Sequence, residues 1–176
     1  ARSGDAVLVS GTLGDHGIAV MSNRDAVVSA TKILSDAQSL NGLVAEMLKA
    51  VPNIRVLRDP TRGGLASALN EIANQSGVGI ALEEASLPIR PEVRSACELM
   101  GLDPLFVANE GKLVAICPAE DAERLLATMR QHPQGRDAAI VGEVIEDTRC
   151  FVHLRTGLGG KRLVDWLAGE QLPRIC

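Results

Sequence analysis

The chain has 176 residues, of which 46% are hydrophobic but only 2% aromatic, and its formal net charge is −4. This length suits a single domain whose aliphatic core needs no disulfide or metal for stability. The acidic balance and the scarcity of aromatic rings argue against nucleic-acid binding, and no apolar run approaches the ~20 residues that cross a bilayer.

The first half of the chain alternates strand and helix patterns. Short apolar runs rich in β-branched residues predict strands, and apolar residues that recur at helical spacing predict helices. The expected order is a strand at 6–10, a helix from about 18, a helix at 40–51, a strand at 54–57 and a helix at 65–77. The second and third of these helices end at Pro52 and Gly77, residues that terminate helices.

The second half follows the same patterns more regularly. The expected order is a strand at 78–82, a helix at 91–100, a strand at 113–117, a helix at about 119–129 and strands at 139–144 and 150–154. This β-α-β-α-β-β order is close to a ferredoxin-like arrangement, with the earlier units added in front. We therefore predict an α+β fold, three-layer α/β/α with a mixed sheet, over residues 1–155.

The cysteines and histidines give no sign of a metal site. No CxxC pair occurs, and no cysteine has zinc-like spacing to a histidine. Cys97 and Cys117 fall on apolar stripes, where a thiol behaves as a small hydrophobe. His153 shares a strand face with Phe151, so we expect it to be half-buried and without a chemical role. We predict no resident metal.

The Gly14–Gly17 turn joins the first strand to the first helix and carries two polar residues. Asp15 is a candidate N-cap of that helix. His16 has two open interpretations, a turn residue bonded to its neighbours or a member of a ligand site.

The densest polar cluster is the loop at 58–64, Arg-Asp-Pro-Thr-Arg-Gly-Gly. Gly63 and Gly64 at a helix start let backbone N–H groups approach an anion. Asp59 suits either a metal or a helix cap, and Arg62 suits either a phosphate or the helix surface. The structural alternative is an elaborate cap. The loop is not a Walker loop, and neither is the stretch at 159–162.

A third polar turn, Asn-Glu-Gly-Lys at 109–112, lies just ahead of a buried strand. Glu110 is a candidate general base whose pKa would be set by burial and nearby charge. Lys112 is a candidate charge partner for it. A plain polar turn is the alternative.

Residues 156–176 are expected to form a flexible tail that ends in a reactive thiol. Three glycines between residues 157 and 160 leave the backbone unusually free. An amphipathic turn at 163–167 offers an anchor, and Pro173 favours an extended approach to Cys176. An ordinary mobile C-terminus is the alternative.

Four motifs occur together and in order: Gly-Asp-His-Gly at 14–17, Asp-Pro-Thr-Arg-Gly-Gly-Leu at 59–65, Asn-Glu-Gly-Lys at 109–112 and Pro-Arg-Ile-Cys at 173–176. In this combination the chain resembles the C-terminal half of the HypE family, the carbamoyl dehydratases of nickel–iron hydrogenase maturation. That family is grouped with aminoimidazole ribonucleotide synthetase and selenophosphate synthetase, so the resemblance implies a PurM-like C-terminal-domain fold. The terminal motif is the specific one.

The resemblance implies that Cys176 accepts a carboxamide from the carbamoyltransferase HypF. ATP then drives dehydration of this thiocarbamate to a thiocyanate, which supplies a cyanide ligand to the hydrogenase iron on the HypC–HypD complex. Glu110 is the implied base. Lys112, the 59–64 loop and the Asp15-His16 turn are implied to line the cleft toward the phosphates.

The chain lacks the ATP-binding, dimer-forming N-terminal half of that family and begins without methionine. We therefore expect a piece of a longer protein that is a homodimer at full length. ATP and Mg²⁺ are expected to bind mainly through the absent half, so this chain alone is expected to fold without hydrolysing ATP.

Two other functions remain open on the sequence. One is an ATP-dependent small-molecule synthetase of the same superfamily, which has no use for a C-terminal cysteine. The other is a non-catalytic docking domain whose tail is a binding peptide. For all three we expect a cytoplasmic location, since no signal peptide is visible, and neither nucleic acid nor membrane as partner.

Overall fold

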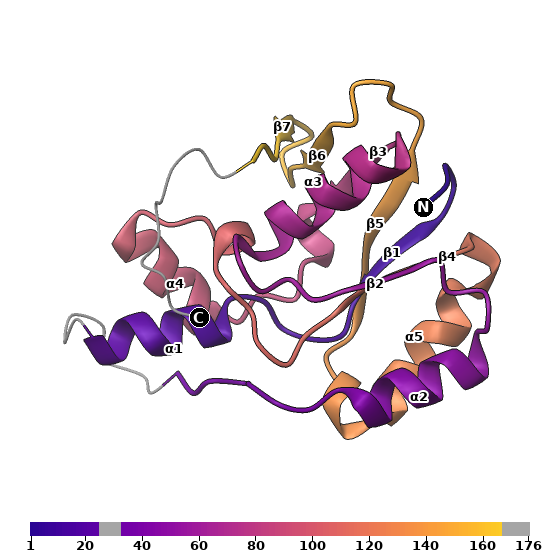
Figure 1. Ribbon diagram of the computed structural model, residues 1–176. Helices are drawn as coiled ribbons and strands as arrows, with labels where there is room; N and C mark the ends of the chain where they lie inside the picture. The colour runs from indigo at the N-terminus through magenta and orange to yellow at the C-terminus, as the bar shows by residue number, and fades with distance from the viewer. Residues whose placement is uncertain (25–32, 167–176) are drawn as a thin grey trace.

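The computed structural model describes residues 1–24 and 33–166 (Figure 1). These residues form one sheet of seven strands in the order β2-β4-β1-β5-β3-β6-β7. Neighbouring strands are antiparallel, except that β3 and β6 run parallel. The strands are β1 (Ala6–Val9), β2 (Val56–Arg58), β3 (Gly79–Glu83), β4 (Val114–Cys117), β5 (Ala139–Ile145), β6 (Val152–Arg155) and β7 (Lys161–Leu163).

Helices cover both faces of this sheet. They are α1 (Asp15–Arg24), α2 (Asn41–Ala50), α3 (Gly64–Ser76), α4 (Pro91–Met100) and α5 (Ala122–Gln131). Side chains alternate along β1, so that Val7 and Val9 pack in the core under α3 while Leu8 packs in the core under α2 and α5. The predicted α+β fold with three layers and a mixed sheet is therefore confirmed.

Helices α1 and α4 form a smaller unit beside the sheet (Figure 1). Ile18 and Met21 of α1 pack against Val93 and Cys97 of α4 in a third apolar cluster. This unit places the start of α1 next to the loops that precede α3 and β4.

The predicted helix ends agree with the backbone. Gly77 follows α3 with φ 66°, in the left-handed region, and its N–H donates to the carbonyls of Ala73 and Asn74. Gly101 follows α4 with φ 66°, and Pro91 begins that helix. These residues stop and start helices because glycine accepts positive φ and proline lacks an N–H.

The order of strands in the sheet differs from the order in which the sequence presents them. Strands β5 and β6 are consecutive in the chain but do not pair, because β3 lies between them. Strand β1 lies between β4 and β5 in the same way. The ferredoxin-like similarity holds for the succession of elements and not for these neighbours.

The sheet continues beyond the domain boundary predicted at residue 155. Strand β7 pairs with β6, and the Thr156 N–H donates to the Gly160 carbonyl at 2.9 Å to close the turn between them. Val164 is fully buried, and its carbonyl accepts from Asn70 Nδ2 at 2.9 Å. The expected glycine hinge is thus a hairpin turn, and residues 156–164 belong to the domain.

Strand β7 includes Leu163, where the sequence predicted the start of an amphipathic turn at 163–167. Residues 167–176 of the predicted tail, with Cys176, lie outside the described residues. Within residues 1–24 and 33–166, none of the helices has the length and apolar character needed to cross a membrane.

Candidate functional site

The three polar loops singled out in the sequence meet at one buried amide, the side chain of Asn109. It is 1% exposed, and its Oδ1 accepts from the Gly14 N–H at 2.7 Å. Its Nδ2 donates to the Pro60 carbonyl at 3.1 Å and to the Val107 carbonyl at 3.0 Å. An amide both donates and accepts, so this one side chain joins the start of α1, the loop before α3 and the turn before β4.

Asp15, the predicted N-cap of the first helix, is instead the first residue of α1. Its side chain is 1% exposed and accepts a hydrogen bond from the Thr12 hydroxyl. Burial raises the pKa of the Asp15 carboxyl, while the Thr12 hydrogen bond and the charge of Arg90 act in the opposite direction. Arg90 Nε lies 3.5 Å from Asp15 Oδ1. This carboxyl is therefore part of the interior and not an open ligand.

His16 follows Asp15 but is only half-buried. Its Nδ1 lies 2.9 Å from the Ser35 Oγ. The contact connects α1 to a segment ahead of α2, and it agrees with the interpretation of His16 as a residue bonded to its surroundings.

Lys112 is nearly buried and forms an ion pair with Asp36. Its side chain crosses Gly11, where a Cβ would lie 2.8 Å from Lys112 Cε. The ammonium is therefore committed to Asp36, and the expectation that Lys112 is the charge partner of Glu110 is wrong for this structure. No sequence pattern pointed to Asp36, because residues 33–40 show neither helical nor strand periodicity.

Glu110 is half-buried, and its carboxylate makes no hydrogen bond or ion pair with any described residue. The residues on either side of it are held, Asn109 by its amide contacts and Gly111, with φ 66°, by a hydrogen bond from Gln38 to its carbonyl. A base that is held by its backbone and not by its carboxylate keeps its lone pairs available.

A cavity of about 320 Å³ opens beside Lys112. It is strongly polar, and among the side chains that line it are Thr12, Asp36, Gln38, Arg90, Lys112 and Arg136. The cations Arg90, Lys112 and Arg136 share this lining with the carboxylates of Asp36 and Asp137, next to the turn that carries Glu110.

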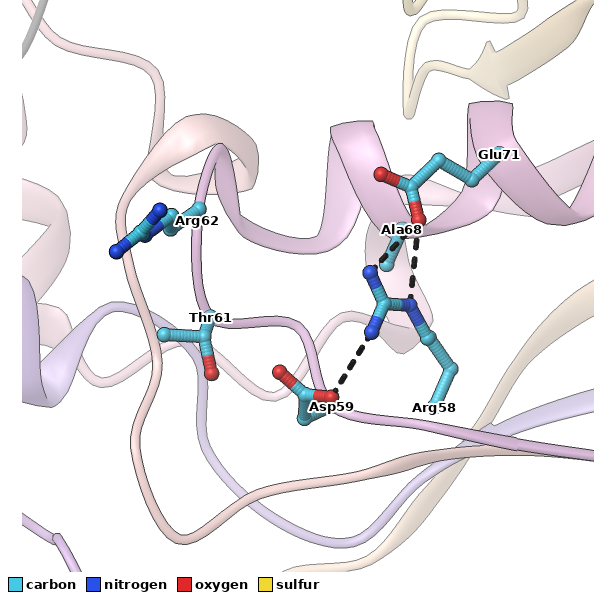
Figure 2. A pocket seen from close by; sticks show the side chains of 6 residues that line it. All are labelled: Arg58, Asp59, Thr61, Arg62, Ala68 and Glu71. Carbon is cyan, nitrogen blue, oxygen red and sulfur yellow. Dashed lines mark hydrogen bonds and ion pairs between the residues drawn. The ribbon is translucent and has the colours of Figure 1, made fainter. Parts of the chain in front are cut away.

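A second cavity of about 270 Å³ lies over the loop before α3 (Figure 2). Arg58 donates to Glu71 Oε2 from two nitrogens, at 3.2 and 2.8 Å, and to Asp59 Oδ1 at 3.1 Å. The hydrogen bond from Thr61 lowers the pKa of the Asp59 carboxyl, and the Arg58 guanidinium lowers it further. Arg62 is exposed at the edge of the same cavity.

The diglycine in this loop is explained by packing. Gly63 and Gly64 have φ of 68° and 62°, in the left-handed region that glycine tolerates. A Cβ on Gly64 would lie 2.5 Å from the Leu105 carbonyl oxygen and 2.6 Å from that of Val107. The loop therefore needs glycine to dock against a neighbouring backbone, whether or not a ligand approaches it.

The described residues hold no group of three or more His, Cys, Asp or Glu side chains placed to bind a metal ion. Cys97 and Cys117 are buried as predicted, and burial raises the pKa of each thiol to about 11. Neither is a thiolate at neutral pH, so neither suits metal binding or nucleophilic chemistry. Cys176, the predicted acceptor, lies outside the described residues.

Comparison with known proteins gives consistent results. A family model described as AIR synthase related protein, C-terminal domain, matches residues 2–155. "Carbamoyl dehydratase HypE" of Cupriavidus necator is 64% identical over 176 residues, which are 100% of this chain and 50% of that protein. The chain spans about half the length of the curated relatives it matches.

Two solved structures are similar over almost the whole chain. The hydrogenase maturation protein HypE in complex with ATP is 48% identical with a TM-score of 0.94, over 100% of this chain and 54% of that one. A HypE–HypF complex is also 48% identical, with a TM-score of 0.90 over 94% of this chain and 54% of that one.

Proposed function

Because the chain belongs to the AIR synthase related protein family through its C-terminal domain, we propose that it is the C-terminal half of a carbamoyl dehydratase of hydrogenase maturation. The observation that carries the proposal is the 64% identity to "Carbamoyl dehydratase HypE", which extends over all 176 residues. The resemblance inferred from the four motifs and the family membership thus agree.

In the proposed reaction, the thiol of Cys176 first receives a carboxamide and becomes a thiocarbamate. The amide oxygen then attacks the γ-phosphorus of ATP, releasing ADP, and the nitrogen loses one proton. The second N–H proton and the phosphorylated oxygen leave together as inorganic phosphate, and the carbon–nitrogen triple bond of a thiocyanate forms. Phosphorylation is needed because an amide oxygen is otherwise a poor leaving group.

We assign the proton acceptor in this reaction to Glu110. Support comes from its uncommitted carboxylate and from the contacts that fix its neighbours Asn109 and Gly111. Lys112, which is paired with Asp36, is proposed to line the cleft toward the phosphates beside this base.

We further propose that one side of the domain faces the ATP phosphates. Support comes from the Asn109 contacts, which draw together the loops that carry Asp15, His16, Asp59, Arg62, Gly63 and Gly64. The donor set of the described residues does not fit a Mg²⁺ ion on its own, so Mg²⁺ is proposed to bind mainly through the other half of the protein. ATP binding is proposed to rest mainly on the other half of the protein.

The partners follow from the same proposal. A HypF-type carbamoyltransferase would load Cys176, in line with the solved HypE–HypF complex of a relative. A HypC–HypD-type iron complex would receive the cyanide. The full-length protein is proposed to act in the cytoplasm as a homodimer.

The test uses the full-length protein, incubated with the carbamoyltransferase, carbamoyl phosphate and ATP and followed by mass spectrometry. The wild type should gain the mass of one carboxamide and then lose that of one water in an ATP-dependent step. Cys176→Ala should show neither change, whereas Cys150→Ala, which removes a half-exposed cysteine, should behave as wild type. Dehydration that persists in Cys176→Ala would contradict the proposal and favour a synthetase of the same superfamily.

A further inference from the structure

Residues 33–40, here called the strap, run without helix or strand from the α1–α4 unit to the start of α2. Ile33 packs against the apolar cluster between α1 and α4. Ser35 Oγ lies 2.9 Å from His16 Nδ1 at the start of α1. The strap is thus anchored before it reaches the turn that carries Glu110.

The strap lies directly on that turn. Gln38 Nε2 donates to the Gly111 carbonyl at 3.2 Å. A Cβ on Gly111 would lie 2.6 Å from the Gln38 nitrogen, and Gly111 has φ 66°. Residue 111 is therefore glycine for two reasons, its positive φ and the closeness of the strap backbone.

The strap also supplies the partner of a buried cation. The side chain of Lys112 is 6% exposed and that of Asp36 is 14% exposed. A lysine this deeply buried is costly unless it is paired, because its charge has lost most of its hydration. Asp15 and Arg90 add weaker charges nearby, and these two lie close enough to interact with each other.

Glu110 is consequently clamped on both sides along the chain. Asn109 fixes the residue before it, and the strap fixes Gly111 and Lys112 after it. The clamp acts on the backbone and on the neighbouring side chains, while the carboxylate of Glu110 contacts no described residue. Such an arrangement positions a base without occupying it.

We propose that Asp36 is a positioning residue for the dehydration step, which holds the Glu110 turn in its working geometry through Lys112 and the strap. The inference rests on the proposed function, in which Glu110 removes a proton from the carboxamide nitrogen. Asp36 acts through other residues, so its loss lowers the rate of proton removal and leaves the loading of the thiol unchanged.

The experiment compares Asp36→Asn with Asp137→Asn in the full-length protein. Asp137 lines the same cavity but is exposed, so it controls for the loss of one negative charge. Loading of the carboxamide, measured by mass spectrometry, should match wild type in both variants. The kcat of ATP-dependent dehydration should fall by about tenfold to a hundredfold in Asp36→Asn only, with an unchanged KM for ATP.

A double variant tests whether Asp36 and Lys112 act as a unit. Asp36→Asn combined with Lys112→Gln should dehydrate the loaded thiol no more slowly than the slower of the two single variants. Losses that multiply in the double variant would show that the two residues act independently, and would overturn the proposal.

Other outcomes separate this inference from the function on which it rests. A wild type that is loaded but never dehydrated would contradict the proposed function and, with it, the role of Asp36. A normal dehydration rate in Asp36→Asn would contradict the positioning role alone, as would equal losses of loading and dehydration. If Asp36→Asn does not fold, Gln38→Ala removes one contact of the same clamp, and a normal dehydration rate in that variant overturns the proposal.

Discussion

Asp15 begins helix α1 and Asp59 lies in the loop before α3, and their surroundings give the two carboxyls opposite properties. Asp15 is 1% exposed, and burial raises the pKa of its carboxyl. Asp59 is 60% exposed, and the Thr61 hydrogen bond lowers the pKa of its carboxyl. Residue type therefore does not decide the behaviour of a carboxyl; the balance between lost hydration and gained hydrogen bonds does.

The ion pair next to Glu110 and the ion pair beside the loop before α3 differ in the same way. Lys112 pairs with Asp36 of the strap, and the lysine side chain is 6% exposed. Arg58 and Glu71 pair on the surface, with side chains 45% and 37% exposed. A buried pair is expensive to break because one charge remains without hydration, whereas an exposed pair contributes about 1 kcal/mol or less. The Lys112–Asp36 pair is thus part of the buried structure, whereas the Arg58–Glu71 pair is a surface contact.

Asn109→Ala should have the largest effect on stability, since this side chain is hydrogen-bonded to the start of α1 and to the loop before α3. The variant leaves the Gly14 N–H and two buried carbonyls without their partner and opens a small cavity. We expect the free energy of unfolding to fall by about 4 kcal/mol, measured by urea denaturation.

The control for that variant is Asn41→Ala. Asn41 is exposed, and among the described residues its side chain accepts from the Ser39 hydroxyl alone, at 2.6 Å. Its removal should change the free energy of unfolding by about 0.5 kcal/mol at most. Similar losses in the two variants would mean that the loops are not held together at Asn109.

The contribution of packing in the loop before α3 is measured by Gly64→Ala. The control is Gly77→Ala, at the other end of the same helix. Both glycines have positive φ, 62° and 66°, but a Cβ meets backbone only at Gly64 and open space at Gly77. We expect Gly77→Ala to lower the free energy of unfolding by about 1 kcal/mol, from the backbone conformation alone. Gly64→Ala should cost about 3 kcal/mol, because a steric clash is added.

Circular dichroism during urea unfolding measures both glycine variants. Equal costs would mean that the loop can move away from residues 105–107 without loss. In that case the diglycine would be retained for some reason other than packing, such as the approach of an anion to the helix start.

The sequence predicted the helices and most strands well, because burial on one face imposes a period on the residues. It could not predict which strands are neighbours, since the pairing of β3 with β6 depends on contacts between distant segments. Strand β7 was missed because Lys161–Leu163 is short, exposed and preceded by two glycines. Periodicity carries no information about such an edge strand.

The candidate site shows the same division. The motifs located the three loops, and their meeting at Asn109 is consistent with a shared role. Asp36 could not have been found, because an ion pair across 76 positions in the chain leaves no local pattern. Asn109 was visible in its motif, but nothing in the sequence showed that its amide makes three buried contacts.

The smallest expected effects are those of pH, and they follow from the opposite pKa shifts of Asp15 and Asp59. Folding raises the pKa of Asp15 above its ordinary value of 3.8, so the folded protein holds this proton to higher pH than the unfolded chain does. The contribution of Asp15 to stability therefore falls as the pH rises from 3.8 through the raised pKa. The difference in free energy of unfolding between wild type and Asp15→Asn should decrease with rising pH in this window.

Asp59 should show the opposite slope, and over a lower range of pH. Its folded pKa lies below 3.8, so its stabilising contribution is present above 3.8 and is lost as the pH falls through the lowered value. The side chain is mostly exposed, which limits the effect to about 0.5 kcal/mol or less. Urea unfolding of wild type and Asp59→Asn across acidic pH measures it. If both aspartates gave slopes of the same sign, burial and hydrogen bonding would not be what separates the two loops.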